Sequence, residues 1–211
     1  MNSCITCKEA IEHCMSTHTF AFAHLYGDEK IMDMHIHNCC EVYYSISGGK
    51  QFLIDHCLYD IRPGDLFLIN QFESHHLTQI DQQTHERIIL SIDPEYLSKL
   101  STGATDLGHC FSFRDTRMPH QIHLSPKEQN RFMYFIHELH DDGGMGEDLL
   151  DQAIFLELMV FLNRAFAARC TDAAAPAPAP SSNYHAQVDA ILSYINSHIG
   201  EPLTLAGLSA H

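Results

Sequence analysis

The sequence predicts a mainly β domain with additional α-helices, in which a sandwich or barrel of short strands precedes two antiparallel helices. Three observations support this fold class. Apolar runs between residues 19 and 92 recur about every ten residues and are separated by turn-forming residues. From residue 125 onward, apolar residues recur at the spacing of a helix. A stretch of alternating Ala and Pro at 173–182 then separates a last segment from the rest.

Composition and charge exclude several classes of protein. Of the 211 residues, 45% are hydrophobic, which suffices for a folded core and argues against disorder. The formal net charge of −15, with histidines counted as neutral, would repel a phosphate backbone, so we do not expect this stretch to bind DNA by itself. No apolar run approaches the roughly 20 residues of a membrane helix, and no signal peptide precedes the first strand. We therefore expect a cytoplasmic protein with no membrane partner.

The predicted strands are short and bounded by turns. Gly48-Gly49 lies between two strand patterns and predicts a hairpin that joins them. Composition predicts a further turn at 62–65. The expected strands are Phe20–Tyr26, Glu41–Ser47, Lys50–Asp55, Leu66–Ile69 and Glu86–Ile92.

Two helices should follow the strands. Ser125, Pro126 and Glu128 form a strong helix start, because serine caps, proline suits the first position and glutamate completes a capping box. A second helix is expected at 147–169 after a loop at 141–146. Such neighbours pack antiparallel, and their apolar stripes must face the strands, each other or another subunit. The stripe residues are Phe132, Phe135, Ile136 and Leu139 on the first helix and Leu150, Ile154, Leu158, Phe161 and Leu162 on the second.

The last segment is predicted to begin a separate domain. Residues 171–183 form the expected linker, and the apolar residues between Val188 and Ile199 recur as on an amphipathic helix. Gly200 and Pro202 end that helix, and Thr204 can cap another. Because two short helices cannot bury enough surface to fold alone, we expect the chain to be a fragment of a longer one. The expected units are therefore 1–124, 125–170, 171–183 and 184–211.

Eight cysteines are present, but their spacing predicts no disulfide framework. Cys4 and Cys7 form a single C-x-x-C pattern without the second ligand pair that a zinc site needs. We expect reduced cysteines that act as small hydrophobic residues. Cys39 and Cys40 are expected in a turn that faces solvent.

A group of metal-ligand residues lies within the predicted strands. His35 and His37 are one residue apart, so on an extended strand their side chains point to the same side. Glu41 follows closely, and His75 can approach from a neighbouring strand, with His76 beside it. Three imidazoles and one carboxylate suit Zn, Ni, Mn, Co or Fe(II). The sequence thus favours a divalent transition metal site.

These residues resemble the two motifs of the cupin superfamily. Gly27, His35, His37, Glu41 and Gly48 resemble the first motif, whereas Gly64-Asp65 and His75 resemble the second. The resemblance implies a double-stranded β-helix, or jelly-roll barrel, whose interior holds a metal through His35, His37, Glu41 and His75. In sensor cupins such residues also persist without a metal or bind an effector by hydrogen bonds. The expected effector contacts are His35, His37, Tyr43 and His75.

Two features depart from the cupin pattern. The spacing from Gly27 to His35 is longer than usual. Asn70 and Phe72 stand where enzymatic cupins typically carry Pro and Gly before the last histidine.

The order of the segments resembles that of AraC-family transcription regulators. In that family a cupin-like barrel precedes two helices, a linker and a helix-turn-helix domain, and residues 188–208 are similar to the opening of that domain. Gly207 and Ser209 depart from its usual helix formers. The resemblance implies a small-molecule effector, a homodimer, and DNA binding through a domain that this chain does not contain. Leu150, Ile154, Leu158 and Phe161 are the expected dimer contacts, with Phe132, Phe135 and Leu139 on the preceding helix.

In this interpretation no residue is catalytic, and effector binding shifts either the N-terminal arm (residues 1–18) or the two helices. Two alternatives remain open because a fold does not specify a function. The first is a metal-dependent cupin enzyme, such as an oxygenase or a sugar isomerase. The second is a module that binds a metal or small molecule without any DNA function.

Overall fold

The computed structural model describes residues 6–27, 34–49, 51–55, 57–79, 85–112, 120–139 and 144–171. The predicted linker, beyond its first residue, and the predicted start of a helix-turn-helix domain lie outside these residues. The strands are β1 Phe20–Gly27, β2 Cys40–Ser45, β3 Gln51–Ile54, β4 Cys57–Asp60, β5 Asp65–Ile69, β6 His75–Gln79, β7 His85–Ile92 and β8 Gln121–His123. The helices are α1 Cys7–Thr17, α2 Pro94–Leu100, α3 His109–Ser112, α4 Pro126–Glu138 and α5 Glu147–Thr171.

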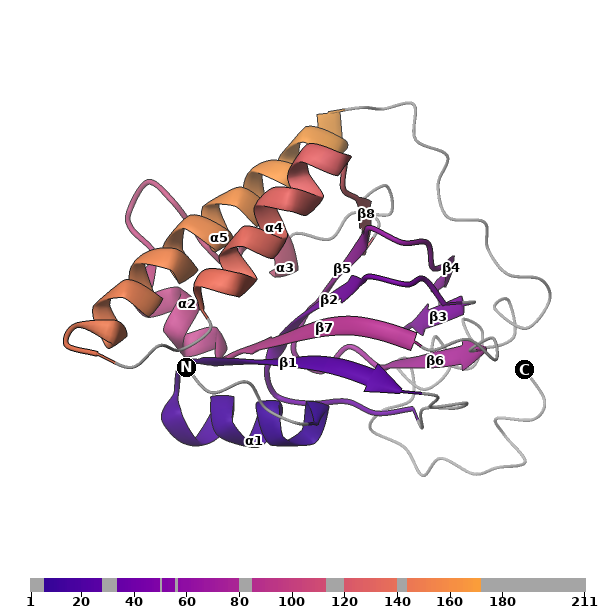
Figure 1. The fold of residues 1–211 in the computed structure, drawn as a ribbon, viewed down its shortest axis with the longest axis horizontal. Coiled ribbons are helices and arrows are strands. Elements are labelled where there is room, and N and C mark those ends of the chain that lie inside the picture. The colour runs from indigo at the N-terminus through magenta and orange to yellow at the C-terminus, as the bar shows by residue number, and fades with distance from the viewer. Residues whose placement is uncertain are drawn as a thin grey trace, which may run out of the picture.

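The fold is mainly β with helices, as the sequence predicted. One sheet has the strand order β1-β7-β2-β5-β8 and the other β4-β3-β6, and all their pairings are antiparallel. The two sheets share one apolar cluster, which includes Tyr43 and Phe67 from the first sheet and Phe52 and Leu77 from the second. This shared cluster forms the interior between the two sheets, whose strands are shown in Figure 1.

The prediction of a hairpin at Gly48-Gly49 is wrong, because the strands on either side do not pair with each other. β2 pairs with β5 and β7 in the larger sheet, whereas β3 pairs with β4 and β6 in the smaller one. The two glycines therefore lead the chain from one sheet to the other. Gly48 has a φ of 83°, and an added Cβ would lie 3.1 Å from Pro63, so this crossing favours glycine.

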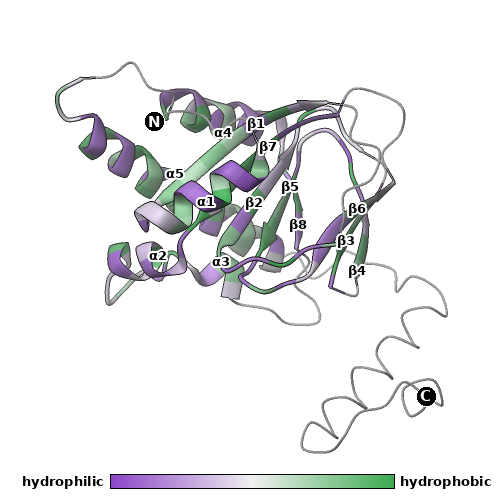
Figure 2. Ribbon diagram, turned by 90° about the horizontal axis from the view of Figure 1, so that it is seen from below, coloured by the Kyte–Doolittle hydropathy of each residue, from purple (hydrophilic) through white to green (hydrophobic). Residues whose placement is uncertain are grey.

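Helices cover the outer face of the larger sheet. α4 and α5 lie along that face in Figure 1, and Figure 2 shows both alternating between hydrophilic and hydrophobic residues. They are antiparallel, because Arg169 at the end of α5 bonds to Glu128 at the start of α4 with Nη2–Oε2 at 2.7 Å. The helix start is as predicted: Ser125 is the N-cap, Pro126 begins α4, and Glu128 accepts from the Ser125 N–H at 2.8 Å.

The central strands are buried on both faces. Every residue of β2 and of β5 is buried. This dual burial explains why Leu66–Ile69 of β5 is a continuous apolar run rather than an alternating pattern. None of the described helices meets the length and apolarity that a membrane crossing requires.

The predicted N-terminal arm contains a helix that the sequence interpretation did not anticipate. Thr6 caps α1 and forms a capping box with Glu9. Ala10 and Cys14 of this helix are fully buried in the interior cluster. α1 is therefore packed against the strands that surround the interior.

Candidate metal centre

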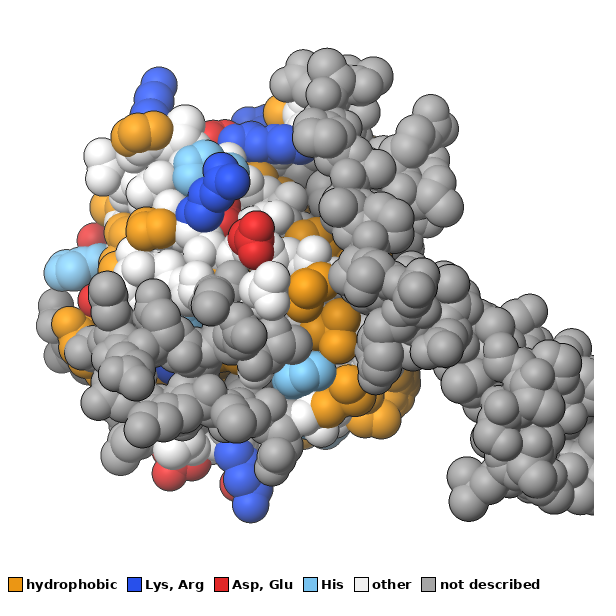
Figure 3. Space-filling model, turned by 90° about the vertical axis from the view of Figure 1, so that its right-hand side faces the viewer, with side chains coloured by type: hydrophobic (Ala, Val, Ile, Leu, Met, Phe, Trp, Pro, Cys, Tyr) orange, Lys and Arg blue, Asp and Glu red, His pale blue; other side chains and the backbone are white. Residues whose placement is uncertain are grey.

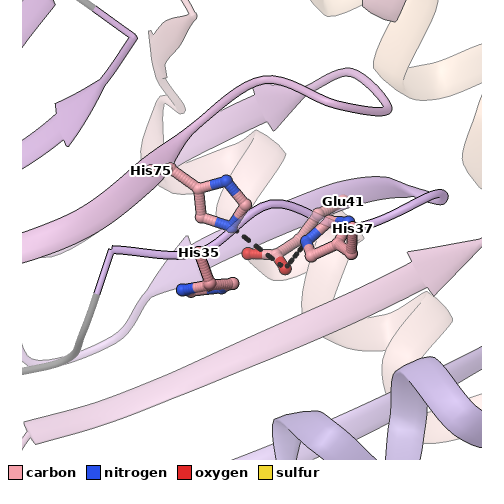
Figure 4. Close-up of side chains that lie close together, drawn as sticks. All are labelled: His35, His37, Glu41 and His75. Atoms are coloured by element: carbon pink, nitrogen blue, oxygen red, sulfur yellow. Dashed lines mark hydrogen bonds and ion pairs between the residues drawn. The ribbon is translucent and has the colours of Figure 1, made fainter.

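The structure brings together the four residues that the sequence singled out. His35 and His37 precede β2, Glu41 lies on β2, and His75 begins β6 (Figure 4). Their ligand atoms all lie within 4.8 Å of one another. Two backbone hydrogen bonds join the segments, since the N–H of His35 donates to the His75 carbonyl at 3.2 Å and the N–H of His75 donates to the His35 carbonyl at 3.1 Å.

Backbone carbonyls orient two of the imidazoles. Nδ1 of His37 lies 3.0 Å from the Cys39 carbonyl oxygen, and Nδ1 of His75 lies 2.9 Å from the Glu73 carbonyl oxygen. A carbonyl can only accept, so each Nδ1 carries the hydrogen and the Nε2 lone pair points elsewhere. The two Nε2 atoms lie 3.1 Å and 3.8 Å from Oε2 of Glu41. Lone pairs and a carboxylate face one another, which requires a shared proton or metal ion.

The electrostatics of the cluster reinforce this requirement. Burial lowers the pKa of His37, but hydrogen bonds to Cys39 and Glu41 outweigh it and raise the pKa to about 10. Burial opposes ionisation of Glu41, yet the hydrogen bond from His37 and the nearby His75 imidazole hold its pKa well below the usual range. Without a metal, the carboxylate therefore stays charged and a proton on His37 balances it. A metal ion would have to displace that proton, so metal affinity should rise with pH.

The residues present fit a divalent transition metal. Nε2 of His75 is buried and makes no hydrogen bond within the described part of the chain, although the Glu41 carboxylate lies nearby. Three imidazoles and one carboxylate form a ligand set that such ions take. His75, rather than His76, contributes to the cluster: His75 is fully buried, whereas His76 is partly exposed.

Aromatic side chains fill the interior next to the cluster. Tyr43 packs against Phe52 and Phe67, with ring centroids 4.9 Å and 5.8 Å away. The Tyr43 hydroxyl lies 2.8 Å from Nε2 of His85, and only 1% of the residue is exposed. This expected effector contact thus lies deep in the core. A cavity of about 710 Å³ lies elsewhere, between α4 and α5.

The prediction that Cys39 and Cys40 face solvent is wrong, because they are 0% and 3% exposed. Cys40 is the first residue of β2, and Cys39 belongs to the interior cluster together with Cys14 of α1. The Cys39 Sγ also lies 3.3 Å from Nδ1 of His37. The segment between His37 and Glu41 is thus covered by α1, which local sequence does not reveal.

Phe72 occupies an unusual backbone conformation beside the cluster. Its φ is 63°, a left-handed value that glycine adopts more readily than other residues. The sequence departs from the cupin pattern at this same position, where enzymatic cupins typically carry glycine. The Phe72 N–H donates to the His37 carbonyl at 2.9 Å, so the β5–β6 loop supports the segment that carries His35 and His37.

The expected dimer contacts do not form one exposed stripe. Leu150 is 66% exposed, whereas Leu158 is fully buried and Phe161 is 8% exposed. Leu158 and Phe161 belong to the cluster that packs α4 and α5 against the larger sheet. The dimer seam stays a prediction, and in the described structure only its N-terminal end is open to a partner.

Comparisons with solved structures found low similarity. A proposed mannose-6-phosphate isomerase of Ralstonia eutropha is 13% identical over 36% of this chain and 76% of the other, with a TM-score of 0.34. Bacillus subtilis oxalate decarboxylase is 20% identical over 40% of this chain and 24% of the other, with a TM-score of 0.34. The DMSP lyase DddQ of Ruegeria pomeroyi is 21% identical over 35% and 38%, with a TM-score of 0.32.

A search of curated proteins found no match. A family model described as the AraC-like ligand binding domain matches residues 19–159, which include both sheets, the four clustered ligands and much of α5. Since this match covers more than half of the chain, the protein belongs to the family of AraC-like ligand binding domains.

Proposed function

We propose that the chain is the effector-sensing and dimerisation part of an AraC-family transcription regulator. Its effector is a small molecule that binds at a divalent transition metal held by His35, His37, Glu41 and His75. The observation that carries this proposal is the buried cluster in which two Nε2 atoms face one carboxylate, within an AraC-like ligand binding domain. DNA binding belongs to a further domain that starts near residue 184.

The residues around the cluster favour an effector with a polar group and an apolar body. When bound, the metal would offer a position for an oxygen or nitrogen donor of the effector. His35 is partly exposed, so a small molecule can approach the cluster at this residue. Phe72, in the β5–β6 loop beside the cluster, is 61% exposed and can contact an apolar part of a ligand.

A direct path connects the cluster with the N-terminal helix. His37 bonds to the Cys39 carbonyl, and the Cys39 side chain belongs to the same buried cluster as Cys14 of α1. A shift of His37 on effector binding would therefore change the packing of α1. The effector must bind the two arrangements with different affinity, because otherwise no switch occurs.

Cobalt binding tests the metal centre. We expect Glu41→Gln and His75→Gln to weaken binding of one Co²⁺ ion about 100-fold or more, since each removes a ligand. His76→Gln is the matched control, because it changes the neighbouring imidazole that lies outside the cluster, and it should bind like wild type. The proposal of a metal centre fails if the first two variants keep wild-type Co²⁺ binding in an absorbance titration.

A test of the regulatory role requires the protein together with its proposed DNA-binding domain. We expect it to select duplex DNA fragments, with an affinity that changes when a chelator removes the metal. A full-length protein that does not bind DNA would contradict the regulator assignment.

Dimerisation is tested at the exposed end of the expected seam. Leu150→Asp should convert a dimer to a monomer in light scattering without unfolding it, because the side chain is 66% exposed within one chain. Tyr134→Asp, at an exposed position of α4, serves as the control. Leu158→Asp is less informative, since Leu158 lies in the core and the variant should lose stability. An unchanged dimer in Leu150→Asp would exclude this seam.

A metal-dependent enzyme, such as an oxygenase or a sugar isomerase, is the second candidate, because the same ligand set suits catalysis. If the chain is a sensor, we expect the metal-loaded protein to show no more oxygen uptake and no more aldose isomerisation than the Glu41→Gln variant. Turnover that this substitution abolishes would favour the enzyme.

A further inference from the structure

A second group of potential ligands lies outside the first centre. Asp55 lies in the turn between β3 and β4, Glu73 in the loop between β5 and β6, and His120 directly before β8. One ligand atom from each lies within 4.8 Å of the others. The proposed function uses none of these three side chains.

The His120 imidazole has one nitrogen atom in a position to bind a cation. Only 8% of this residue is exposed, and its Nε2 atom is buried without a hydrogen bond among the described residues. Oε2 of Glu73 lies 3.3 Å from that atom, but not in hydrogen-bonding geometry. Nδ1 lies 2.9 Å from the Tyr59 hydroxyl, which fixes the ring. When Nδ1 donates to this hydroxyl, Nε2 presents its lone pair to the carboxylates.

Backbone donors hold both carboxylates in place. Glu73 Oε2 accepts from the N–H of Asn70 at 2.6 Å. Asp55 Oδ1 accepts from the Ser74 N–H at 2.9 Å and from the Ser74 hydroxyl at 3.2 Å. Two negative charges fixed close together, beside an imidazole with an unused nitrogen, are favoured when a cation lies between them.

We propose that Asp55, Glu73 and His120 form a second divalent cation site. One imidazole and two carboxylates suit Zn²⁺ or Mn²⁺. The cation binds Nε2 of His120, which makes no hydrogen bond among the described residues, and it relieves the repulsion between the two carboxylates. Through one ion, the site joins three segments: the β3–β4 turn, the β5–β6 loop and the residue directly before β8.

Glu73 connects the second site to the first. Its side chain is a ligand of the second site, whereas its backbone carbonyl accepts the Nδ1–H of His75. A cation that fixes Glu73 therefore also fixes the orientation of a first-site imidazole. This connection rests on the proposed metal centre, but the second site does not.

Zinc stoichiometry after equilibrium dialysis separates the two sites. We expect wild type to retain two Zn²⁺ ions per chain, Glu41→Gln one, Glu73→Gln one, and the double variant none. The side-chain amide that Glu73→Gln introduces can still accept from the Asn70 N–H through its oxygen, so this variant should fold. Asp60→Asn is the matched control, because it neutralises an exposed carboxylate on the adjacent strand β4 and should retain both ions.

Asp55→Asn gives an independent measurement, because its exposed side chain contributes little to the core. It should weaken the second ion at least about tenfold. The second site is refuted if Glu73→Gln and Asp55→Asn both retain wild-type zinc. If Glu73→Gln loses an ion and Glu41→Gln does not, the second site stands and the first centre falls.

Discussion

The two faces of the larger sheet differ in chemistry although the same strands form both. On β2, Glu41 and Tyr43 point into the interior between the sheets, whereas Val42 and Tyr44 face the helices. Side chains alternate along a strand, so one short segment supplies both a candidate metal ligand and a core residue. The comparison shows that neighbouring residues can serve different purposes, one chemical and the other structural.

The helix-covered face is almost entirely apolar. Its cluster includes Phe20 of β1, Leu90 of β7 and Phe155 of α5, all nearly inaccessible. The interior face instead contains buried polar groups, among them Glu41 of β2 and His85 of β7. Apolar burial stabilises the first face, whereas the second keeps polar groups that cost desolvation unless they have partners. Figure 3 shows that on the surface, too, histidine lies beside hydrophobic side chains.

The largest effect on stability is expected on the helix-covered face. Phe155→Ala should lower the free energy of unfolding by about 3–5 kcal/mol, since the ring is fully buried and stacks on Phe20 with centroids 4.3 Å apart. Urea denaturation measures this loss. Cobalt affinity of the folded protein should not change. A loss below about 1 kcal/mol would contradict the assignment of stability to this face.

Removing a polar group from the interior face should lower the free energy of unfolding by less than Phe155→Ala does. Tyr43→Phe removes the hydrogen bond between the hydroxyl and His85, which should lower the free energy of unfolding by about 1–2 kcal/mol. Tyr44→Phe is the matched control, because Tyr44 lies next in sequence but faces the helices, where its ring packs on Phe132 with centroids 4.6 Å apart. The comparison of faces is weakened if both variants lose the same stability in denaturant titrations.

The smallest effect concerns the ion pair that joins the ends of α4 and α5, and it depends on pH. Arg169 donates two hydrogen bonds to the Glu128 carboxylate, at 2.8 Å and 2.7 Å. Mainly through this pairing, the pKa of Glu128 falls from its ordinary value of 4.5 to about 2. A folded-state pKa below the unfolded one stabilises the fold above pH 4.5, and this stabilisation is lost as pH falls toward 2.

Glu128→Gln should therefore cost about 1 kcal/mol at neutral pH, because the pair is partly exposed. The difference from wild type should vanish near pH 2 in thermal or chemical unfolding. Glu138→Gln, at the other end of α4, is the control. A difference that stays constant from pH 7 to pH 2 would show that the charge of Glu128 is not the cause.

Some features that were missed had local signals. Thr6 and Glu9 have the spacing of a capping box and begin α1, and Asp93 followed by Pro94 caps α2. Other features had none. The exchange of partners at Gly48-Gly49 depends on which strands meet in space, and a glycine pair suits either a hairpin or a crossing.

By itself, the sequence determined the strand-rich class, the start of α4 and the identity of four potential metal ligands. Each depends on short-range spacing, because helix caps and the alternation of side chains along a strand are local properties. Only the tertiary structure decided which sheet each strand joins, that Cys39 is buried under α1, and that Asp55 lies near His120. These depend on contacts between residues far apart in the chain, which no local pattern encodes.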